Sequence, residues 1–208
     1  MTNEELDARV ARAVDNFMAG YGCCQSVVAA FSDLYGLDET MAKRIAAGFG
    51  GGVGRLRMMC GAVSGIVMLV GLDCGQTEGS DREGKSACYK VVQDLLAKSK
   101  EENGSLICAE ILGLKGYEKA TSSYVASART AEYYKTRPCA AKVESAARIF
   151  ANYLKAVGNA SSVARSSRQR FPALRENKHY ANRRTGLSDR EALRLYAYRR
   201  AAAGLAAV

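Results

Sequence analysis

Apolar residues recur at helical spacing along most of the chain. In the first segment they fall on one face from Leu6 to Phe17, after Thr2 and Glu5 at the spacing of a capping box. Similar apolar faces predict further helices over residues 23–35, 38–47, 60–72, 81–102, 105–112 and 138–157. No segment shows a convincing strand alternation and no internal repeat occurs. The pattern therefore predicts an all-α fold, a compact multi-helix domain.

A glycine-rich stretch, GFGGGVG at residues 48–54, separates two of these helices. Because glycine permits a left-handed backbone and close approach, the stretch predicts a tight corner between helices. Its exposed N–H groups and the arginines that follow would also suit an anion or the sulfur atoms of a cluster. The residues predicted to support such a bound group are Gly51, Gly52, Gly54, Arg55 and Gly61.

The stretch GSDREGKS, residues 79–86, matches the spelling of a phosphate-binding loop, G-x-x-x-x-G-K-[ST]. Such a loop needs a strand directly before its first glycine, and a later apolar run ending in Asp to hold Mg²⁺. The chain predicts neither. We therefore expect no ATP at this stretch, and we expect Ser80 or Asp81 to cap the helix that follows.

Charge divides the chain into two unequal parts. Residues 1–158 contain 19 Lys and Arg against 18 Asp and Glu, and residues 159–208 contain 11 against 3, so +1 and +8 give the total of +9. The predicted organisation is a helical cysteine-bearing domain over 1–158 and an Arg-rich extension over 159–208, partly disordered with one helix. Nucleic acid is a candidate partner through this extension alone. The composition favours a poorly ordered tail without a partner over a nucleic-acid-binding one.

The first ten residues, MTNEELDARV, are acidic and lack the apolar segment of a secretory signal. The longest uncharged run, Met58 to Leu72, is too short and too rich in glycine to predict a membrane span. Seven cysteines in such a chain point to reduced thiols, metal ligands or redox chemistry. We therefore expect a cytoplasmic protein.

Several cysteines are predicted at the beginnings of helices, where partial positive charge favours the thiolate over the thiol. The thiolate is the form that attacks disulfides and binds metals. Their spacing contains no C-x-x-C pair of the kind found in zinc and ferredoxin sites. The alternative is that they are small apolar core residues, the role expected of Cys74 and Cys88. The four at helix starts are Cys23, Cys60, Cys108 and Cys139.

Five blocks along the chain resemble, in order, the C_GCAxxG_C_C family of redox-active proteins: GYGCCQSVVAAF, GFGGGVGR, CGAVSG, SLICAEILG and RPCAAKVESAA. The resemblance covers roughly residues 10–157. It implies that the same four cysteines are the signature of the family, that Cys24 is a local addition, and that Cys74 and Cys88 have no counterpart. The family is similar to a module beside an iron–sulfur centre in split-Soret cytochromes, which implies an iron–sulfur cluster on the four cysteines.

The favoured function is therefore a redox-active protein whose four dispersed cysteines bind an iron–sulfur cluster for electron transfer. A dithiol–disulfide protein is the first alternative, although the attacking and resolving thiols of such proteins are usually adjacent in sequence. The second is a non-enzymatic binding module with structural cysteines and a tail that binds nucleic acid. The redox partner is not predicted, and a homodimer would let two chains supply ligands.

Overall fold

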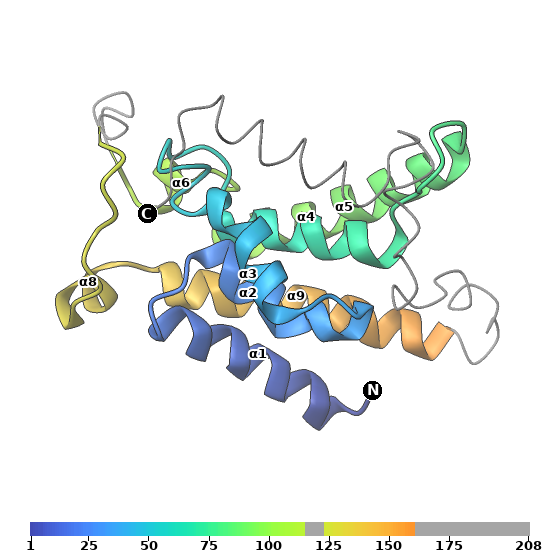
Figure 1. Ribbon diagram of the computed structural model, residues 1–208, viewed down its shortest axis with the longest axis horizontal. Helices are drawn as coiled ribbons and strands as arrows, with labels where there is room; N and C mark the ends of the chain where they lie inside the picture. Colours follow the sequence, from blue (N-terminus) through green and yellow to red (C-terminus); the bar gives the residue numbers. More distant parts are fainter. Residues whose placement is uncertain (115–122, 161–208) are drawn as a thin grey trace, which may run out of the picture. The chain divides into compact units, whose positions relative to one another are not determined.

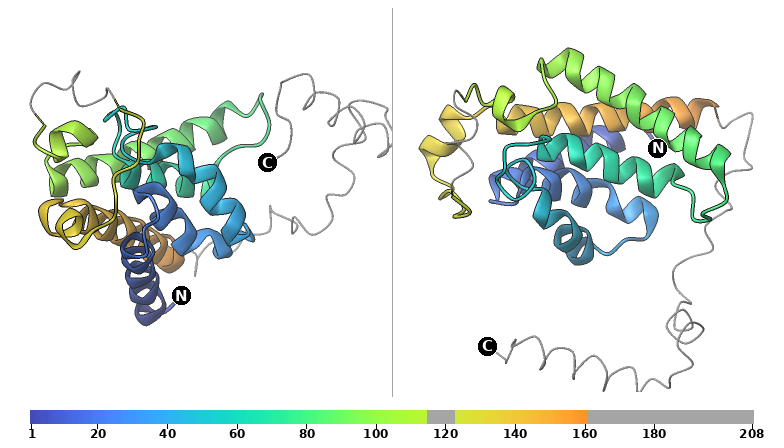
Figure 2. Two further views of the ribbon diagram at one scale, coloured as in Figure 1. Left: turned by 60° about the vertical axis from the view of Figure 1, so that its left-hand side comes forward. Right: turned by 90° about the horizontal axis from the view of Figure 1, so that it is seen from above.

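A short helix that is buried on almost every side forms the centre of the fold. Helix α2 packs against α1, α3, α4 and α9, and α4 packs in turn against α5 and α9 (Figures 1 and 2). All residues of α2 except Cys23 and Gln25 are buried. The α-helices are α1 (Asn3–Met18), α2 (Cys23–Phe31), α3 (Glu39–Ala46), α4 (Gly61–Cys74), α5 (Arg82–Asn103), α6 (Cys108–Ile111), α8 (Ala131–Thr136) and α9 (Cys139–Ala160), with 3-10 helices η1 (Ser32–Tyr35) and η2 (Ala47–Phe49).

The computed structural model describes residues 1–114 and 123–160, the last two without their side chains. Within these ranges there is no strand, and strand-like pairing is limited to one antiparallel bridge between Met59 and Ile107. The all-α prediction is therefore confirmed. The chain divides into two units, Met1–Arg165 and Ser166–Val208. The predictions for the basic extension fall almost entirely outside the described residues.

The core is built from aromatic and small apolar side chains on the inward faces of α1, α2, α4 and α9. Phe17, Phe31 and Phe150 are its largest fully buried side chains. The rings of Phe31 and Phe150 meet edge to face with centroids 5.2 Å apart, an arrangement that aromatic quadrupoles favour. This contact joins α2 to α9 and so fixes two of the helices whose first residues are cysteines.

Side-chain caps begin several helices where the sequence predicts them. Thr2 and Glu5 form the capping box of α1, and the carboxylate of Asp38 accepts the N–H of Met41 at the start of α3. Asp81 caps α5 by accepting the N–H of Gly84 at 2.8 Å. The GSDREGKS stretch therefore forms the cap and first turn of α5, and within the described chain no strand precedes it.

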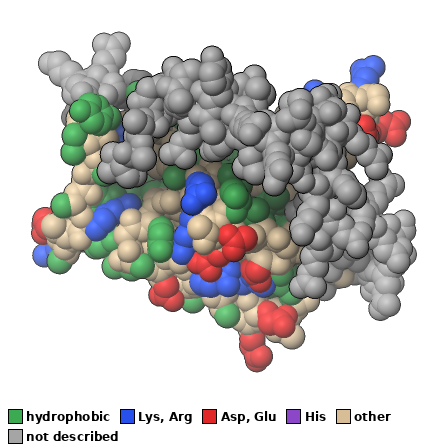
Figure 3. Space-filling model, in the orientation of Figure 1, with side chains coloured by type: hydrophobic (Ala, Val, Ile, Leu, Met, Phe, Trp, Pro, Cys, Tyr) green, Lys and Arg blue, Asp and Glu red, His purple; other side chains and the backbone are tan. Residues whose placement is uncertain are grey.

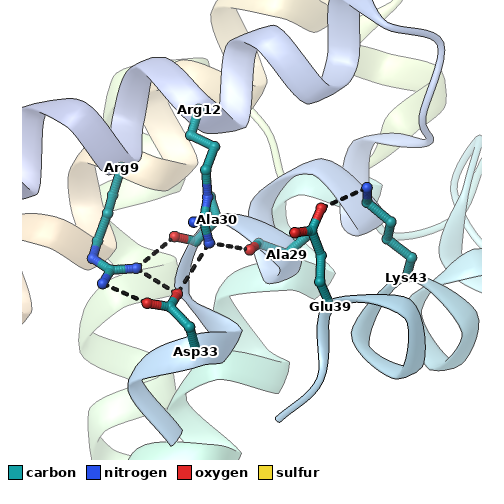
Figure 4. Close-up of polar contacts among 7 residues, drawn as sticks. All are labelled: Arg9, Arg12, Ala29, Ala30, Asp33, Glu39 and Lys43. Atoms are coloured by element: carbon teal, nitrogen blue, oxygen red, sulfur yellow. Dashed lines mark hydrogen bonds and ion pairs between the residues drawn. The ribbon is translucent and has the colours of Figure 1, made fainter. Parts of the chain in front are cut away.

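Two arginines of α1 satisfy the carboxyl end of α2. Arg9 donates to the carbonyl of Ala30 at 2.9 Å, and Arg12 donates to that of Ala29 at 2.6 Å (Figure 4). Both guanidinium groups also bind the carboxylate of Asp33 in η1. The last carbonyls of a helix lack partners within the helix, so these contacts both cap α2 and hold α1 against it.

Helices α2 and α4 approach closely because α4 presents glycine to α2. A Cβ atom at Gly65 would lie 2.8 Å from the Cβ of Val27, and one at Gly61 would lie 3.2 Å from the Cβ of Cys23. Both distances are shorter than ordinary contacts between carbon atoms. The glycines of α4 thus form its contact with α2.

The glycine-rich corner adopts a left-handed backbone over consecutive residues, including some that are not glycine. Gly51 and Gly52 have φ values of 64° and 74°, but Val53, Arg55 and Arg57 also have φ near 60°. A left-handed conformation is unfavourable for such side chains. The sequence did not predict it, because nothing local distinguishes these residues. It also did not predict α8, which is short and lies in a stretch that appeared irregular.

Candidate functional site

The four cysteines predicted at helix starts converge on one cavity of about 650 Å³. The glycine-rich corner, α6 and α8 gather at the end of the fold where α2, α4 and α9 begin, on the left in Figure 1. Three of the cysteines are the first residues of α2, α6 and α9, and the fourth is the N-cap of α4. The cysteines that line the cavity are Cys23, Cys60, Cys108 and Cys139.

Backbone hydrogen bonds fix Cys60 and Cys108 relative to each other. The N–H of Cys60 donates to the carbonyl of Leu106 at 2.8 Å, and the N–H of Cys108 donates to that of Met58 at 2.6 Å. These bonds surround the bridge between Met59 and Ile107. The start of α4 and the start of α6 therefore form one paired unit, although they are far apart in sequence.

Cys23 and Cys139 form the most direct thiol pair in the cavity, since the thiol of Cys23 is hydrogen-bonded to the sulfur of Cys139. This bond, with help from nearby arginines, lowers the pKa of Cys139 to about 7. The same bond, followed by burial, raises the pKa of Cys23 well above its ordinary value. We assign the thiolate to Cys139 because the arginines stabilise its charge and Cys23 is surrounded by other thiols. The pair thus contains one nucleophilic thiolate and one protonated thiol.

The expectation that a helix start favours the thiolate is wrong for Cys60 and Cys108, because the pKa of each thiol is raised. Burial raises the pKa of Cys60, although the N–H groups of Ala62 and Val63 partly oppose the shift. Burial also raises the pKa of Cys108 against a hydrogen bond from Arg57. Desolvation disfavours the charged form, and at these two residues it outweighs the partial charge of the helix end.

The glycines and the arginine expected to support a bound group all line the cavity, but glycine is required at only some of these places. A Cβ atom at Gly52 would lie 2.6 Å from the Cβ of Cys108, and one at Gly61 would crowd Cys23. Gly54, in contrast, has no atom within 4 Å of such a position. The members of this set are Gly51, Gly52, Gly54, Arg55 and Gly61.

Of the residues that give the cavity its charge, the sequence predicts only Arg55 and Arg57, the arginines that follow the glycine-rich stretch. Besides Arg55, four basic residues line the cavity, and no aspartate or glutamate of the described chain does. Arg129 is held by its bond to the carbonyl of Tyr21 and by the rings of Phe17 and Tyr133, whose centroids lie 4.7 and 4.5 Å away. For the other basic residues of the lining, the one available sequence signal was that Arg137 is close to Cys139 along the chain. The four are Arg57, Arg129, Arg137 and Lys142.

The three remaining cysteines do not line this cavity. Cys24 is fully buried and its sulfur lies 3.5 Å from the sulfur of Met68. Cys74 and Cys88 are hydrogen-bonded to each other where α4 packs on α5. Close by, the carboxylate of Asp73 accepts hydrogen bonds from Tyr35 and Tyr153 at 3.0 and 2.6 Å.

The cavity does not suit a single metal ion but is compatible with an iron–sulfur cluster. Among the described residues, no group of three or more His, Cys, Asp or Glu is arranged to hold one metal ion. An iron–sulfur cluster distributes its cysteine ligands over several iron atoms, so its thiolates need not surround a single point. The convergence of four thiols and the clearance left by glycine suit a cluster, whereas the direct contact of Cys23 with Cys139 suits a dithiol.

The fold and the site define an all-α protein with thiols gathered on a basic cavity. The family model described as "Putative redox-active protein (C_GCAxxG_C_C)" matches residues 21–153, and the chain belongs to that family. No curated protein matches the chain, and no solved structure does. No helix in the described part of the chain is long and apolar enough to cross a membrane.

Proposed function

We propose that the protein is a dithiol–disulfide redox protein in which Cys139 attacks and Cys23 resolves. The observation that carries this proposal is that the two thiols line the same cavity and interact with each other there. Proteins that exchange disulfides usually place the two thiols close in sequence, and here the fold supplies the closeness instead. The redox role of the family supports the same chemistry.

The proposed reaction has two exchange steps. The thiolate of Cys139 attacks one sulfur of a substrate disulfide, forms a mixed disulfide and releases the other half as a thiolate, which takes a proton. The thiol of Cys23 then loses its proton and attacks the sulfur of Cys139. The second half of the substrate leaves as a thiol. Two electrons pass from the protein to the substrate, and Cys23 and Cys139 end as a disulfide.

The surroundings of Cys139 support its role as the attacking thiol. Arg137, Arg129 and Arg57 lower the pKa of Cys139, after the larger effect of its hydrogen bond from Cys23. An attacking thiol works best when its pKa is near the ambient pH. Cys23 is positioned to donate a proton to the resting thiolate and to attack next.

Mass spectrometry of the oxidised protein tests this proposal. We expect mild oxidation by a small disulfide to link Cys23 to Cys139, and dithiothreitol to reverse the link. Cys139→Ser should abolish the link, whereas Cys88→Ser, a substitution outside the cavity, should retain it. Failure of the wild-type protein to form a disulfide between Cys23 and Cys139 would refute the dithiol mechanism.

An iron–sulfur cluster held by the four cysteines is the second candidate. It is favoured by one observation: all four thiols, and not only the pair, line the same cavity. Cys23, Cys60, Cys108 and Cys139 would be its ligands, and the basic lining would offset its negative charge. Such a cluster would supply electron transfer.

Iron and acid-labile sulfide assays with an absorption spectrum distinguish the two candidates, on protein purified without oxygen. A cluster predicts broad visible absorption that Cys60→Ser abolishes. The dithiol mechanism predicts colourless protein in which Cys60→Ser leaves the Cys23–Cys139 disulfide intact. A spectrum that remains blank after reconstitution with iron and sulfide would eliminate the cluster.

A further inference from the structure

We propose that the substrate of this site is a small organic disulfide carrying carboxylates, which the arginines of the cavity bind on both sides of the reacting sulfur atoms. This inference rests on the dithiol function proposed above and adds the class of substrate. It is carried by the charge of the lining, by buried donors without acceptors and by the size of the cavity.

The described lining of the cavity contains basic side chains and no acidic ones. Arginine and lysine contribute five side chains to it, and none of the aspartates and glutamates in residues 1–114 and 123–160 lines it. Elsewhere several of the described basic residues are paired with carboxylates, as Arg9 is with Asp33 and Lys90 with Asp94. On the outer face drawn in Figure 3, acidic and basic side chains lie next to each other. A cavity with one sign of charge attracts ligands of the opposite sign.

Three of these arginines carry buried nitrogen atoms that have no acceptor among the described residues. Arg57 is only 6% exposed, and its Nε lacks a partner although its guanidinium contacts Cys108. The Nε of Arg55 and one terminal nitrogen of Arg129, Nη1, are also buried without a partner. A buried donor without an acceptor destabilises the fold. Carboxylate oxygens of a ligand would satisfy these donors with charge-assisted hydrogen bonds.

The basic residues of the lining come from two separate segments of the chain. Arg57 comes from the glycine-rich corner, whereas Arg129 and Arg137 come from the segment around α8. All three act electrostatically on Cys139. A disulfide with a carboxylate on each half could place its sulfur atoms at Cys139 and its two charges at these two groups.

The size of the cavity favours an organic ligand over a small inorganic anion. Its volume of about 650 Å³ lies within the range of roughly 300–1,000 Å³ typical of sites for organic ligands. One water molecule occupies about 30 Å³ in the liquid, so phosphate would leave most of the cavity filled by solvent. Glutathione disulfide has the required charge and is the probe used below.

The reaction remains balanced with this substrate. The Cys139 thiolate, the Cys23 thiol and one disulfide become one protein disulfide and two substrate thiols; one of the two protons comes from Cys23 and the other from solvent. No other oxidant or reductant takes part. The bound carboxylates do not react, and they serve to orient the disulfide.

Rates of oxidation by three disulfides test the inference. Fully reduced protein at neutral pH is treated with glutathione disulfide, which is anionic, with hydroxyethyl disulfide, which is neutral, or with cystamine, which is cationic. The Cys23–Cys139 disulfide is quantified by mass spectrometry, and each rate is divided by that of a free small thiol. We expect the anionic disulfide to react about tenfold faster than the neutral one, with the difference shrinking at high salt.

The outcomes separate this inference from the function on which it rests. If the neutral or cationic disulfide oxidises the pair as fast as the anionic one, the substrate class is wrong and the dithiol function stands. If none of the three forms the disulfide, the dithiol function itself fails. If inorganic phosphate prevents oxidation at the concentrations at which glutathione disulfide acts, the site selects small anions and the inference is overturned.

A matched pair of variants locates the selectivity. Arg55 lines the cavity and is not among the main causes that shift the pKa of Cys139. Arg55→Gln should therefore lower the ratio of the anionic to the neutral rate about tenfold. Arg44→Gln, an exposed change in α3 outside the cavity, should keep the wild-type ratio. If both variants have the same ratio of anionic to neutral rate, then Arg55 and the charge of the cavity do not select the substrate.

Discussion

The thiol of Cys23 is hydrogen-bonded to the sulfur of Cys139, and this one contact shifts the pKa values of the two residues in opposite directions. The contact joins the first residue of α2 to the first residue of α9. Each helix is held there by the core, in which Phe31 meets Phe150. The reactivity of the pair therefore depends on helix packing as much as on the residues around the sulfur atoms.

Removing the partner thiol should make Cys139 less reactive at neutral pH. In the wild-type protein the alkylation rate of Cys139 should rise with pH and reach half its maximum near pH 7, because only the thiolate reacts and its pKa is about 7. Cys23→Ala removes the largest cause of the low pKa, so the half-maximum should move to higher pH. Iodoacetamide labelling followed by mass spectrometry measures both profiles.

Cys24→Ala is the matched control, because Cys24 is adjacent in sequence but contacts Met68 instead of the pair. Its profile should coincide with that of the wild-type protein. A Cys23→Ala profile with its half-maximum unmoved would show that the arginines alone set the pKa of Cys139.

The contacts of Asp33 with Arg9 and Arg12 should make stability depend on acid. The hydrogen bond from Arg9 is the main cause that lowers the pKa of Asp33 below its ordinary value of 3.8. The carboxylate therefore contributes stability above about pH 4, and this contribution is lost as pH falls through the lower pKa of the folded state. Because Asp33 is half exposed, Asp33→Asn should cost about 1 kcal/mol or less at neutral pH.

Urea unfolding at several pH values checks this expectation. The difference in unfolding free energy between wild-type protein and Asp33→Asn should be present at pH 7 and should disappear near pH 2. A difference that stays constant over this range would assign the effect to the capping geometry of the side chain and not to its charge.

A methyl group at Gly65 should push α4 away from α2. Its Cβ would lie 2.8 Å from the Cβ of Val27, so overpacking should exceed the gain in helix propensity and lower the unfolding free energy by about 1–2 kcal/mol. Gly71, in the same helix, has no atom within 4 Å of its Cβ position. Gly71→Ala should therefore raise the unfolding free energy by about 0.5–1 kcal/mol. Equal effects of the two substitutions in urea unfolding would contradict the close approach of the helices.

The glycine-rich corner offers a second comparison at equal backbone strain. Both Gly52 and Gly54 have positive φ, so either alanine substitution should cost about 1–2 kcal/mol for a left-handed residue. Only Gly52→Ala adds a collision, with Cys108 and with the backbone of Arg57. It should destabilise more in urea unfolding and should alter the alkylation of Cys108. Gly54→Ala should leave that alkylation at the wild-type rate, and a change there would mean that strain alone disturbs the site.

The helix starts could be predicted because their signals are local. Thr2, Asp38 and Asp81 each have a side chain that accepts an N–H within the next turn, so the sequence alone identifies the cap. Cysteines at such starts could be selected in the same way. Their convergence on one cavity depends on contacts between distant segments, which spacing does not encode.

Most of the charge of the site could not be predicted for a similar reason. Arg129 and Lys142 approach the thiols only because α8 and α9 fold beside the glycine-rich corner. The expected thiolate character of Cys60 was wrong, since the pattern shows a helix start but not the depth at which its thiol is buried. The left-handed backbone of Val53 and Arg55 is likewise imposed by the tertiary fold.

The position of α9 after every other described element has a consequence during synthesis of the chain. Cys23 is made early and Cys139 late, and α9 must then pack against α1 and α2 before the two sulfur atoms meet. A nascent chain that ends before α9 carries Cys23 without its partner. Cys139, the proposed nucleophile, is therefore the last of the four thiols to be made. Its low pKa depends on the folded contacts of α9, so the reactivity of Cys139 would indicate that the domain has finished folding.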